Sequence, residues 1–191
     1  MNHQGHPMRP LERASLPIDS LVNDFLAQTR EESPALAKYL DDLDLVGKNE
    51  LGGVLGRFDF HKRGSLDPHE RLMARRILGR LHRPSKDSLT LTNQILDYLD
   101  LNHNAVLEED EVSFTIEILE MFATADSDND TLSEIELGML YAVLRHLDKT
   151  DNHVLDAAER QQLHDALKAP RAFLERQKVV NPLLVKLLEN R

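Results

Sequence analysis

Four stretches of the chain carry short oxygen-bearing side chains at every second place, and this rhythm limits the fold more than any other feature. The clearest example is residues 100–111, which begin with Asp and end with Glu. Similar stretches occupy residues 59–70, 126–136 and 148–159, and we number the four as the first to fourth loops in chain order. Apolar residues recur at helical spacing on both sides of each loop. The sequence therefore predicts an all-α protein made of helix–loop–helix repeats.

The side chains of the second and fourth loops match the ligand positions of a calcium site. Ca²⁺ takes about six to eight oxygens, and a twelve-residue loop supplies them from its positions 1, 3, 5, 7, 9 and 12. The predicted ligands are Asp100, Asn102, Asn104, the Val106 carbonyl, Glu108 and Glu111 in the second loop, and Asp148, Thr150, Asn152, the Val154 carbonyl, Asp156 and Glu159 in the fourth. The loops and their flanking helices resemble the EF-hand family. That resemblance implies Ca²⁺ as the bound cofactor.

The turn in the middle of each loop affects how well it is expected to bind. Ala105 stands where a Gly is preferred in the second loop, at a cost of about 1 kcal/mol for positive φ. His153 holds the same position in the fourth loop and tolerates positive φ somewhat better. Both loops are predicted to bind calcium.

The third loop is shorter than the others. It has eleven residues, lacks one residue in the turn, and places Thr131 there. Its predicted ligands are Asp126, Asp128, Asp130 and Glu136. We expect it to bind calcium with altered geometry.

The first loop departs furthest from the calcium pattern. His61 and Arg63 stand where oxygen ligands are needed, and Arg63 brings a permanent positive charge. We predict that this loop is structural and free of metal. The alternative is a transition-metal site formed by Asp59, His61, His69 and Glu70, because imidazole suits such ions.

The spacing of the loops predicts how the repeats are joined. Their first residues are 41, 26 and 22 residues apart, which leaves 14 residues (112–125) and 11 residues (137–147) between the last three loops. Each interval holds one helix, so the helix that leaves one loop enters the next. A helix of 14 residues is about 21 Å long, so the third loop should lie at the far end of its helix from the second. Its partner is then the first repeat or another subunit, whereas the first and second loops should lie side by side.

The residues outside the loops complete the predicted organisation. We expect a flexible tail (1–16), two N-terminal helices (17–48), the repeats (49–168) and a basic amphipathic helical segment (169–191). Pro17 is expected to open the first helix, Ser33 and Pro34 the second, and Gly47 to end it. The C-terminal segment resembles helices that calcium sensors bind. Three roles remain open for it: an internal ligand of the repeats, a helix that covers the fold, or a segment that binds a membrane surface.

Charge and composition narrow the function. Residues 97–159 hold 17 acidic and two basic residues, a net charge of −15, so that the rest of the chain carries +5 of the total of −10. Such a segment repels nucleic acid. No cysteine, membrane-length apolar run, secretory signal or catalytic motif is found, so we expect a non-enzymatic cytoplasmic protein. The prediction is a calcium sensor that regulates a protein partner; a calcium buffer, a metal-independent scaffold and homo-oligomerisation remain alternatives.

Overall fold

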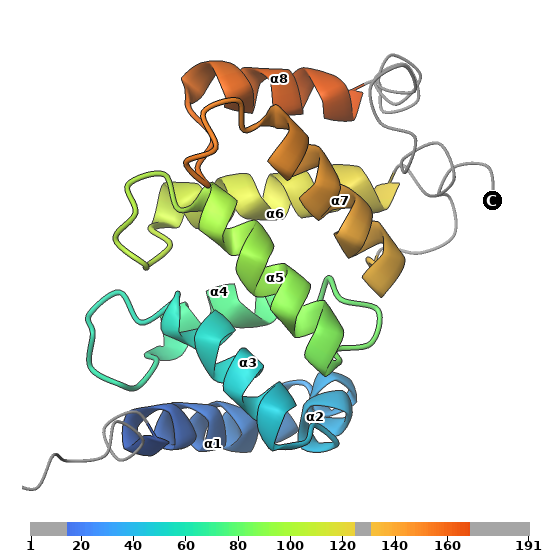
Figure 1. The fold of residues 1–191 in the computed structure, drawn as a ribbon. Helices are drawn as coiled ribbons and strands as arrows, with labels where there is room; N and C mark the ends of the chain where they lie inside the picture. The colour runs from blue at the N-terminus through green and yellow to red at the C-terminus, as the bar shows by residue number, and fades with distance from the viewer. Residues whose placement is uncertain (1–14, 125–130, 169–191) are drawn as a thin grey trace, which may run out of the picture.

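The computed structural model describes residues 15–124 and 131–168, and these residues form eight α-helices without a β-strand (Figure 1). The helices are α1 (Ser15–Glu32), α2 (Pro34–Asp41), α3 (Leu45–Gly56), α4 (Pro68–Leu78), α5 (Lys86–Leu99), α6 (Glu109–Thr124), α7 (Glu134–Leu147) and α8 (Ala157–Lys168). The all-α prediction is therefore confirmed for this part of the chain. The predicted tail up to residue 14, the ligands Asp126, Asp128 and Asp130, and the segment 169–191 lie outside the described residues.

The helices are arranged as a stack in which, apart from α2, which packs on α1, each packs against the next but one. Helix α3 packs on α1 and on α5, and α5 packs on α7 (Figure 1). In the same way α4 contacts α6, and α6 contacts α8. The first, second and fourth loops join α3 to α4, α5 to α6 and α7 to α8, so they lie along one edge of the stack (Figure 1). A single helix links the second loop to the third and the third to the fourth, as the spacing predicts.

One continuous hydrophobic core runs through the stack. Its members extend from Phe25 in α1 through Leu55 in α3 and Leu96 in α5 to Leu144 in α7 and Leu163 in α8. All five side chains are nearly inaccessible to solvent. The loops are thus held on a scaffold that is packed from end to end.

Backbone hydrogen bonds connect neighbouring loops along their shared edge. The Leu107 N–H in the second loop donates to the Arg57 carbonyl at the end of α3 (2.7 Å). The Leu155 N–H in the fourth loop donates to the Tyr98 carbonyl in α5 (3.4 Å). The second loop therefore lies beside the start of the first loop, as predicted, and the fourth loop lies beside the second.

The described part of the third loop has a partner that the sequence analysis did not identify. Leu132 pairs with Leu81 in an isolated parallel bridge. The Leu132 N–H donates to the Arg80 carbonyl (2.6 Å), and the His82 N–H donates to the Leu132 carbonyl (2.9 Å). The partner of this part of the loop is thus the connection between α4 and α5, which directly follows the exit helix of the first repeat. That connection lies at the opposite edge of the stack, where α6 delivers the third loop.

The N-terminal helices need one correction. Pro34 does begin α2 after Ser33, although the Ser33 side chain makes no capping hydrogen bond. Gly47 does not end a helix, because α2 ends at Asp41 and Gly47 lies in the first turn of α3. The Gly47 N–H donates to the side chain of the N-cap residue Asp44 (2.7 Å). A Cβ at position 47 would lie 3.0 Å from a Leu43 side-chain carbon, so this Gly permits close packing and does not stop the helix.

Across residues 15–124 and 131–168, no helix has both the length and the apolar character needed to span a membrane.

Candidate metal-binding loops

The first, second and fourth loops share one backbone conformation. Their fourth and sixth residues have positive φ: Lys62 (52°) and Gly64 (70°), His103 (56°) and Ala105 (63°), and Asp151 (53°) and His153 (60°). Only one of these residues is Gly, and a left-handed conformation is unfavourable for the others. The predicted positive φ of Ala105 and His153 is confirmed. Three different sequences therefore adopt the same turn.

A buried carboxylate at the first position holds each turn in place. The Asp59 side chain accepts hydrogen bonds from the N–H groups of Arg63 (2.9 Å) and Gly64 (2.7 Å). Asp100 accepts from Asn104 (3.2 Å) and Ala105 (2.8 Å). Asp148 accepts from Asn152 (3.2 Å) and His153 (2.9 Å). Charge-assisted hydrogen bonds of this kind offset the cost of the positive φ values.

The last residue of each loop is a buried Glu that is also held by the loop backbone. Glu111 accepts hydrogen bonds from the N–H groups of Leu101 (2.8 Å) and Glu108 (2.9 Å). Glu159 accepts from Lys149 (2.7 Å) and Asp156 (2.9 Å). Glu111 and Glu159 are both 3% exposed, so the side chains of both point into the protein and not toward solvent. Each closing Glu thus joins the start of its loop to the start of the helix that follows.

The middle residues of the second loop keep their oxygens near the loop surface. Asn102 and Asn104 are exposed, and the Asn104 side-chain oxygen accepts from the Val106 N–H (2.8 Å). The Asn104 side-chain amide donates to Glu108 (3.1 Å). These local hydrogen bonds involve predicted ligands, and they are of the kind that a bound cation would replace.

The carboxylates of the second loop are electrostatically crowded. Burial raises the pKa of Glu111, and the negative charges of Asp100 and Glu108 raise it further, against the opposing effect of the backbone hydrogen bonds. One positive group lies near: the Arg57 guanidinium is 3.6 Å from the Asp100 carboxylate and also pairs with Asp97. Arg57 was not predicted as part of this site, because it lies at the end of α3, the helix that enters another loop. A cation bound among these carboxylates would relieve their repulsion.

The fourth loop stabilises the ionised form of its first carboxylate. Burial alone would raise the pKa of Asp148, but hydrogen bonds from His153, Asn152 and Thr150 outweigh this effect and lower it. The Asn152 side-chain oxygen accepts from the Val154 N–H (3.0 Å). Asp148 is therefore ionised at neutral pH and available to a cation.

Of the ligands predicted for the third loop, Glu136 lies within the described residues. Glu136 is buried and forms a capping box with Ser133 at the start of α7, with 2.6 Å between the Ser133 nitrogen and a Glu136 carboxylate oxygen. It thus occupies the same place relative to its helix as Glu111 and Glu159 do.

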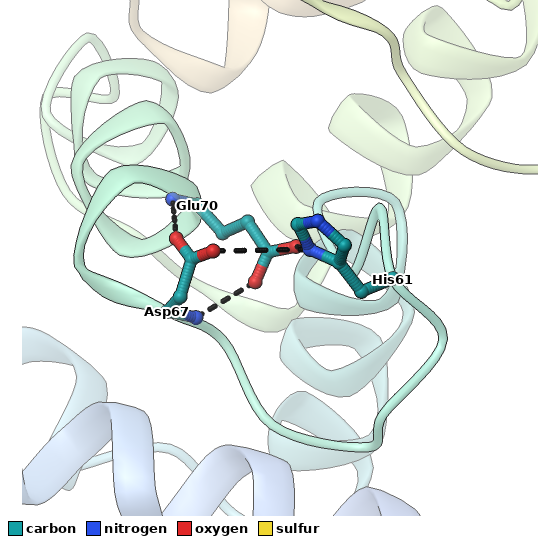
Figure 2. Close-up of side chains that lie close together, drawn as sticks. All are labelled: His61, Asp67 and Glu70. Atoms are coloured by element: carbon teal, nitrogen blue, oxygen red, sulfur yellow. Dashed lines mark hydrogen bonds and ion pairs between the residues drawn. The ribbon is translucent and has the colours of Figure 1, made fainter.

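The first loop gathers a cluster that is not found in the second or fourth loop. His61, Asp67 and Glu70 bring an imidazole nitrogen and two carboxylate oxygens within 4.8 Å of one another (Figure 2). His61 Nδ1 lies 2.8 Å from Glu70 Oε1 and 3.8 Å from Asp67 Oδ2. Arg63 lies beside them, its guanidinium 3.2 Å from Asp67. A positive side chain therefore stands next to this cluster.

The transition-metal alternative is only partly matched by this geometry. Of its four residues, the structure brings His61 and Glu70 together. Both Asp59 oxygens accept N–H groups of the turn, and His69 is exposed outside the cluster. The third member is Asp67. The signal for Asp67 in the sequence was its spacing from Glu70, which is that of a capping box.

A pocket of about 540 Å³ lies between the second and fourth loops. His103 and His153 from the loops line it, together with Tyr98 and Tyr141. The Tyr98 hydroxyl lies 3.4 Å from His153 Nδ1, and the two rings are 5.9 Å apart. Tyr98 therefore contacts the fourth loop through both its carbonyl and its side chain.

Comparison of the chain with protein-family models, with curated proteins and with solved structures gives no match. Any function assigned to it therefore depends on the chemistry of these loops.

Proposed function

We propose that the chain is a calcium-binding protein of the EF-hand type that senses calcium through its second and fourth loops. The observation that supports this most directly is the backbone that these loops share. In each it holds a buried Asp at the first position and a buried Glu at the last, with predicted oxygen ligands exposed between them. What sets these two loops apart from the first, which has the same turn, is that they carry oxygen ligands at the third and fifth positions, where the first loop has His61 and Arg63.

The charges of the loops suit Ca²⁺. Each loop offers three carboxylates and two neutral oxygen side chains at the predicted ligand positions, and hard cations prefer such ligands. Binding neutralises the carboxylates and takes the place of weak local contacts such as the one between Asn104 and Glu108. The three carboxylates at ligand positions in each loop are accounted for by cation binding, so we propose binding and not catalysis.

The sensor role follows from the way in which the loops are connected. A closing Glu that moves toward the ion carries the next helix with it. Glu111 lies in the first turn of α6 and Glu159 in the first turn of α8, and these two helices pack against each other. We propose that their rearrangement is detected by a protein partner or by the basic segment 169–191.

Calorimetric titration of the full chain with Ca²⁺ in excess Mg²⁺ tests the proposal. We expect two sites with dissociation constants of about 10⁻⁷–10⁻⁵ M, the range of sensors. Glu111→Gln and Glu159→Gln should each remove one site, and the double variant should remove both. Glu109→Gln is the matched control, because Glu109 is exposed within the second loop but is not at a ligand position. Absence of calcium binding, or unchanged binding in the double variant, would contradict the proposal.

A further inference from the structure

We propose that the first loop is a separate site for a divalent transition-metal ion such as Zn²⁺, held by His61, Asp67 and Glu70. This inference goes beyond the calcium proposal, because it concerns another loop and another class of metal. It does not depend on whether the second and fourth loops bind calcium.

The three ligand atoms already have nearly the spacing of a metal shell (Figure 2). Zinc bonds to nitrogen and oxygen are about 2.0–2.2 Å long, so neighbouring ligand atoms of a tetrahedral site lie about 3.3–3.5 Å apart. His61 Nδ1 lies 2.8 Å from Glu70 Oε1 and 3.8 Å from Asp67 Oδ2, on either side of that value. Side-chain shifts of about half an ångström would bring these two distances to the value for a tetrahedral site, and the third pair of ligand atoms, from Asp67 and Glu70, lies within 4.8 Å.

The helix cap orients both carboxylates. Asp67 Oδ1 accepts from the Glu70 N–H (2.9 Å), and Glu70 Oε2 accepts from the Asp67 N–H (2.7 Å). Each carboxylate thus spends one oxygen on the backbone and presents the other, Oδ2 or Oε1, to His61 (Figure 2). Glu70 is completely buried, which fixes it further. Supporting hydrogen bonds of this kind are typical of metal ligands.

The donor set selects the metal. One imidazole nitrogen with two carboxylate oxygens suits Zn²⁺, Cu²⁺ or Ni²⁺, whereas Ca²⁺ prefers oxygen alone. The predicted ligands of the second and fourth loops contain no imidazole. The three loops therefore differ in specificity although they share a backbone.

Arg63 limits the affinity of this site. Its guanidinium lies 3.2 Å from Asp67 Oδ2 and 3.4 Å from Glu70 Oε2, where it competes with a metal for the same carboxylates. The Arg63 side chain is 49% exposed, so it can turn into solvent when an ion enters. When the metal ion replaces the Arg63 guanidinium, the negative charge of the buried Glu70 stays balanced by a positive charge.

The test is a calorimetric titration of the full chain with Zn²⁺ in the presence of saturating Ca²⁺. His61→Ala should weaken one site by at least about tenfold, because a ligand matters at least as much as its supporting residues. Arg63→Gln should tighten the same site severalfold by removing the competing cation. His69→Ala is the matched control and should leave the Zn²⁺ affinity unchanged, because His69 is exposed on α4 outside the cluster.

His3 and His6 offer other imidazole ligands for Zn²⁺, so Zn²⁺ binding by the wild type alone does not identify the site. The site is identified by the difference in Zn²⁺ affinity between the variants. His61 is 59% exposed, so His61→Ala should fold, and circular dichroism checks this. Visible spectra with Co²⁺ give a second readout: wild type should show the intense bands of a tetrahedral site, and His61→Ala should lose them. Equal Zn²⁺ affinity in wild type and His61→Ala, or no tightening in Arg63→Gln, would overturn the proposal.

Discussion

Single residues in the turns show how far a loop can depart from ideal chemistry and keep its shape. Ala105 holds a φ of 63°, the same region that Gly64 uses in the first loop. The Ala105 N–H bond to Asp100 (2.8 Å) helps to hold it there. The loop therefore keeps a conformation that its own residue disfavours, because the buried Asp needs that N–H group.

Replacing this residue by Gly should relieve the strain. We expect Ala105→Gly to raise the free energy of unfolding of the metal-free protein by up to about 1 kcal/mol, because Gly adopts positive φ without a steric penalty. Ala158→Gly is the control, since Ala158 is exposed within α8 and its replacement should lower stability by about 0.5–1 kcal/mol. Urea denaturation measures both. If Ala105→Gly is as destabilising as Ala158→Gly, the positive φ is not a source of strain.

At the scale of helices, an ion pair joins the end of α1 to the end of α2. The Arg30 guanidinium donates two hydrogen bonds to Asp41, at 3.0 and 2.6 Å. These hydrogen bonds lower the pKa of Asp41, and the positive charge of Arg30 adds to the effect. The contact is exposed, so salt should weaken it.

The direction of this pKa shift fixes its pH dependence. Because the pKa of Asp41 is lower in the folded than in the unfolded protein, its stabilising contribution is complete above the unfolded value of 3.8. It is lost as the pH falls through the folded value. In Arg30→Gln the pKa of Asp41 should rise toward 3.8, and this part of the acid destabilisation should disappear. NMR titration of the Asp41 carboxyl carbon checks it, and an unchanged pKa in the variant would contradict the assignment.

Local patterns predicted the elements, and contacts between distant segments account for what was missed. The flanking apolar rhythm located the helices around each loop, and the loop spacing correctly predicted one helix on either side of the third loop. The prediction that Gly47 ends a helix was wrong, because a Gly can permit close packing as well as end a helix. The place of Arg57 beside Asp100 depends on how α3 packs on α5, and the pairing of Leu132 with Leu81 depends on where the connection between α4 and α5 meets the third loop. No local sequence signal encodes that register.

The whole molecule is a stack in which α5 occupies a central place. It packs on α3 on one side and on α7 on the other, and it carries the first ligand predicted for the second loop at its end. Leu96 in α5 is 1% exposed. A substitution that disrupts the packing of α5 should therefore destabilise both halves of the stack, the one that contains α3 and the one that contains α7.

Leu96→Ala tests whether the stack of helices unfolds as one cooperative unit. We expect a loss of about 2–5 kcal/mol in the free energy of unfolding, with one transition retained in helical circular dichroism and Tyr fluorescence. Leu72→Ala is the control, because Leu72 in α4 is 46% exposed and its loss should cost less than about 0.5 kcal/mol. Two separate transitions in the wild type would show instead that the halves unfold independently.

Successive connections between the helices alternate between the two edges of the stack, so the edge on which a loop lies depends on whether an odd or an even number of helices precedes it. The connection between α4 and α5, residues 79–85, turns the chain without an oxygen-rich loop, yet its backbone pairs with Leu132 on the far edge. Because of this extra turn, the first loop falls on the same edge as the second. Loss of any single helix would transfer every later loop to the other edge, whereas loss or gain of a helix pair would leave the edges unchanged. The chain can therefore lengthen or shorten only in units of two helices without separating the loops that lie together.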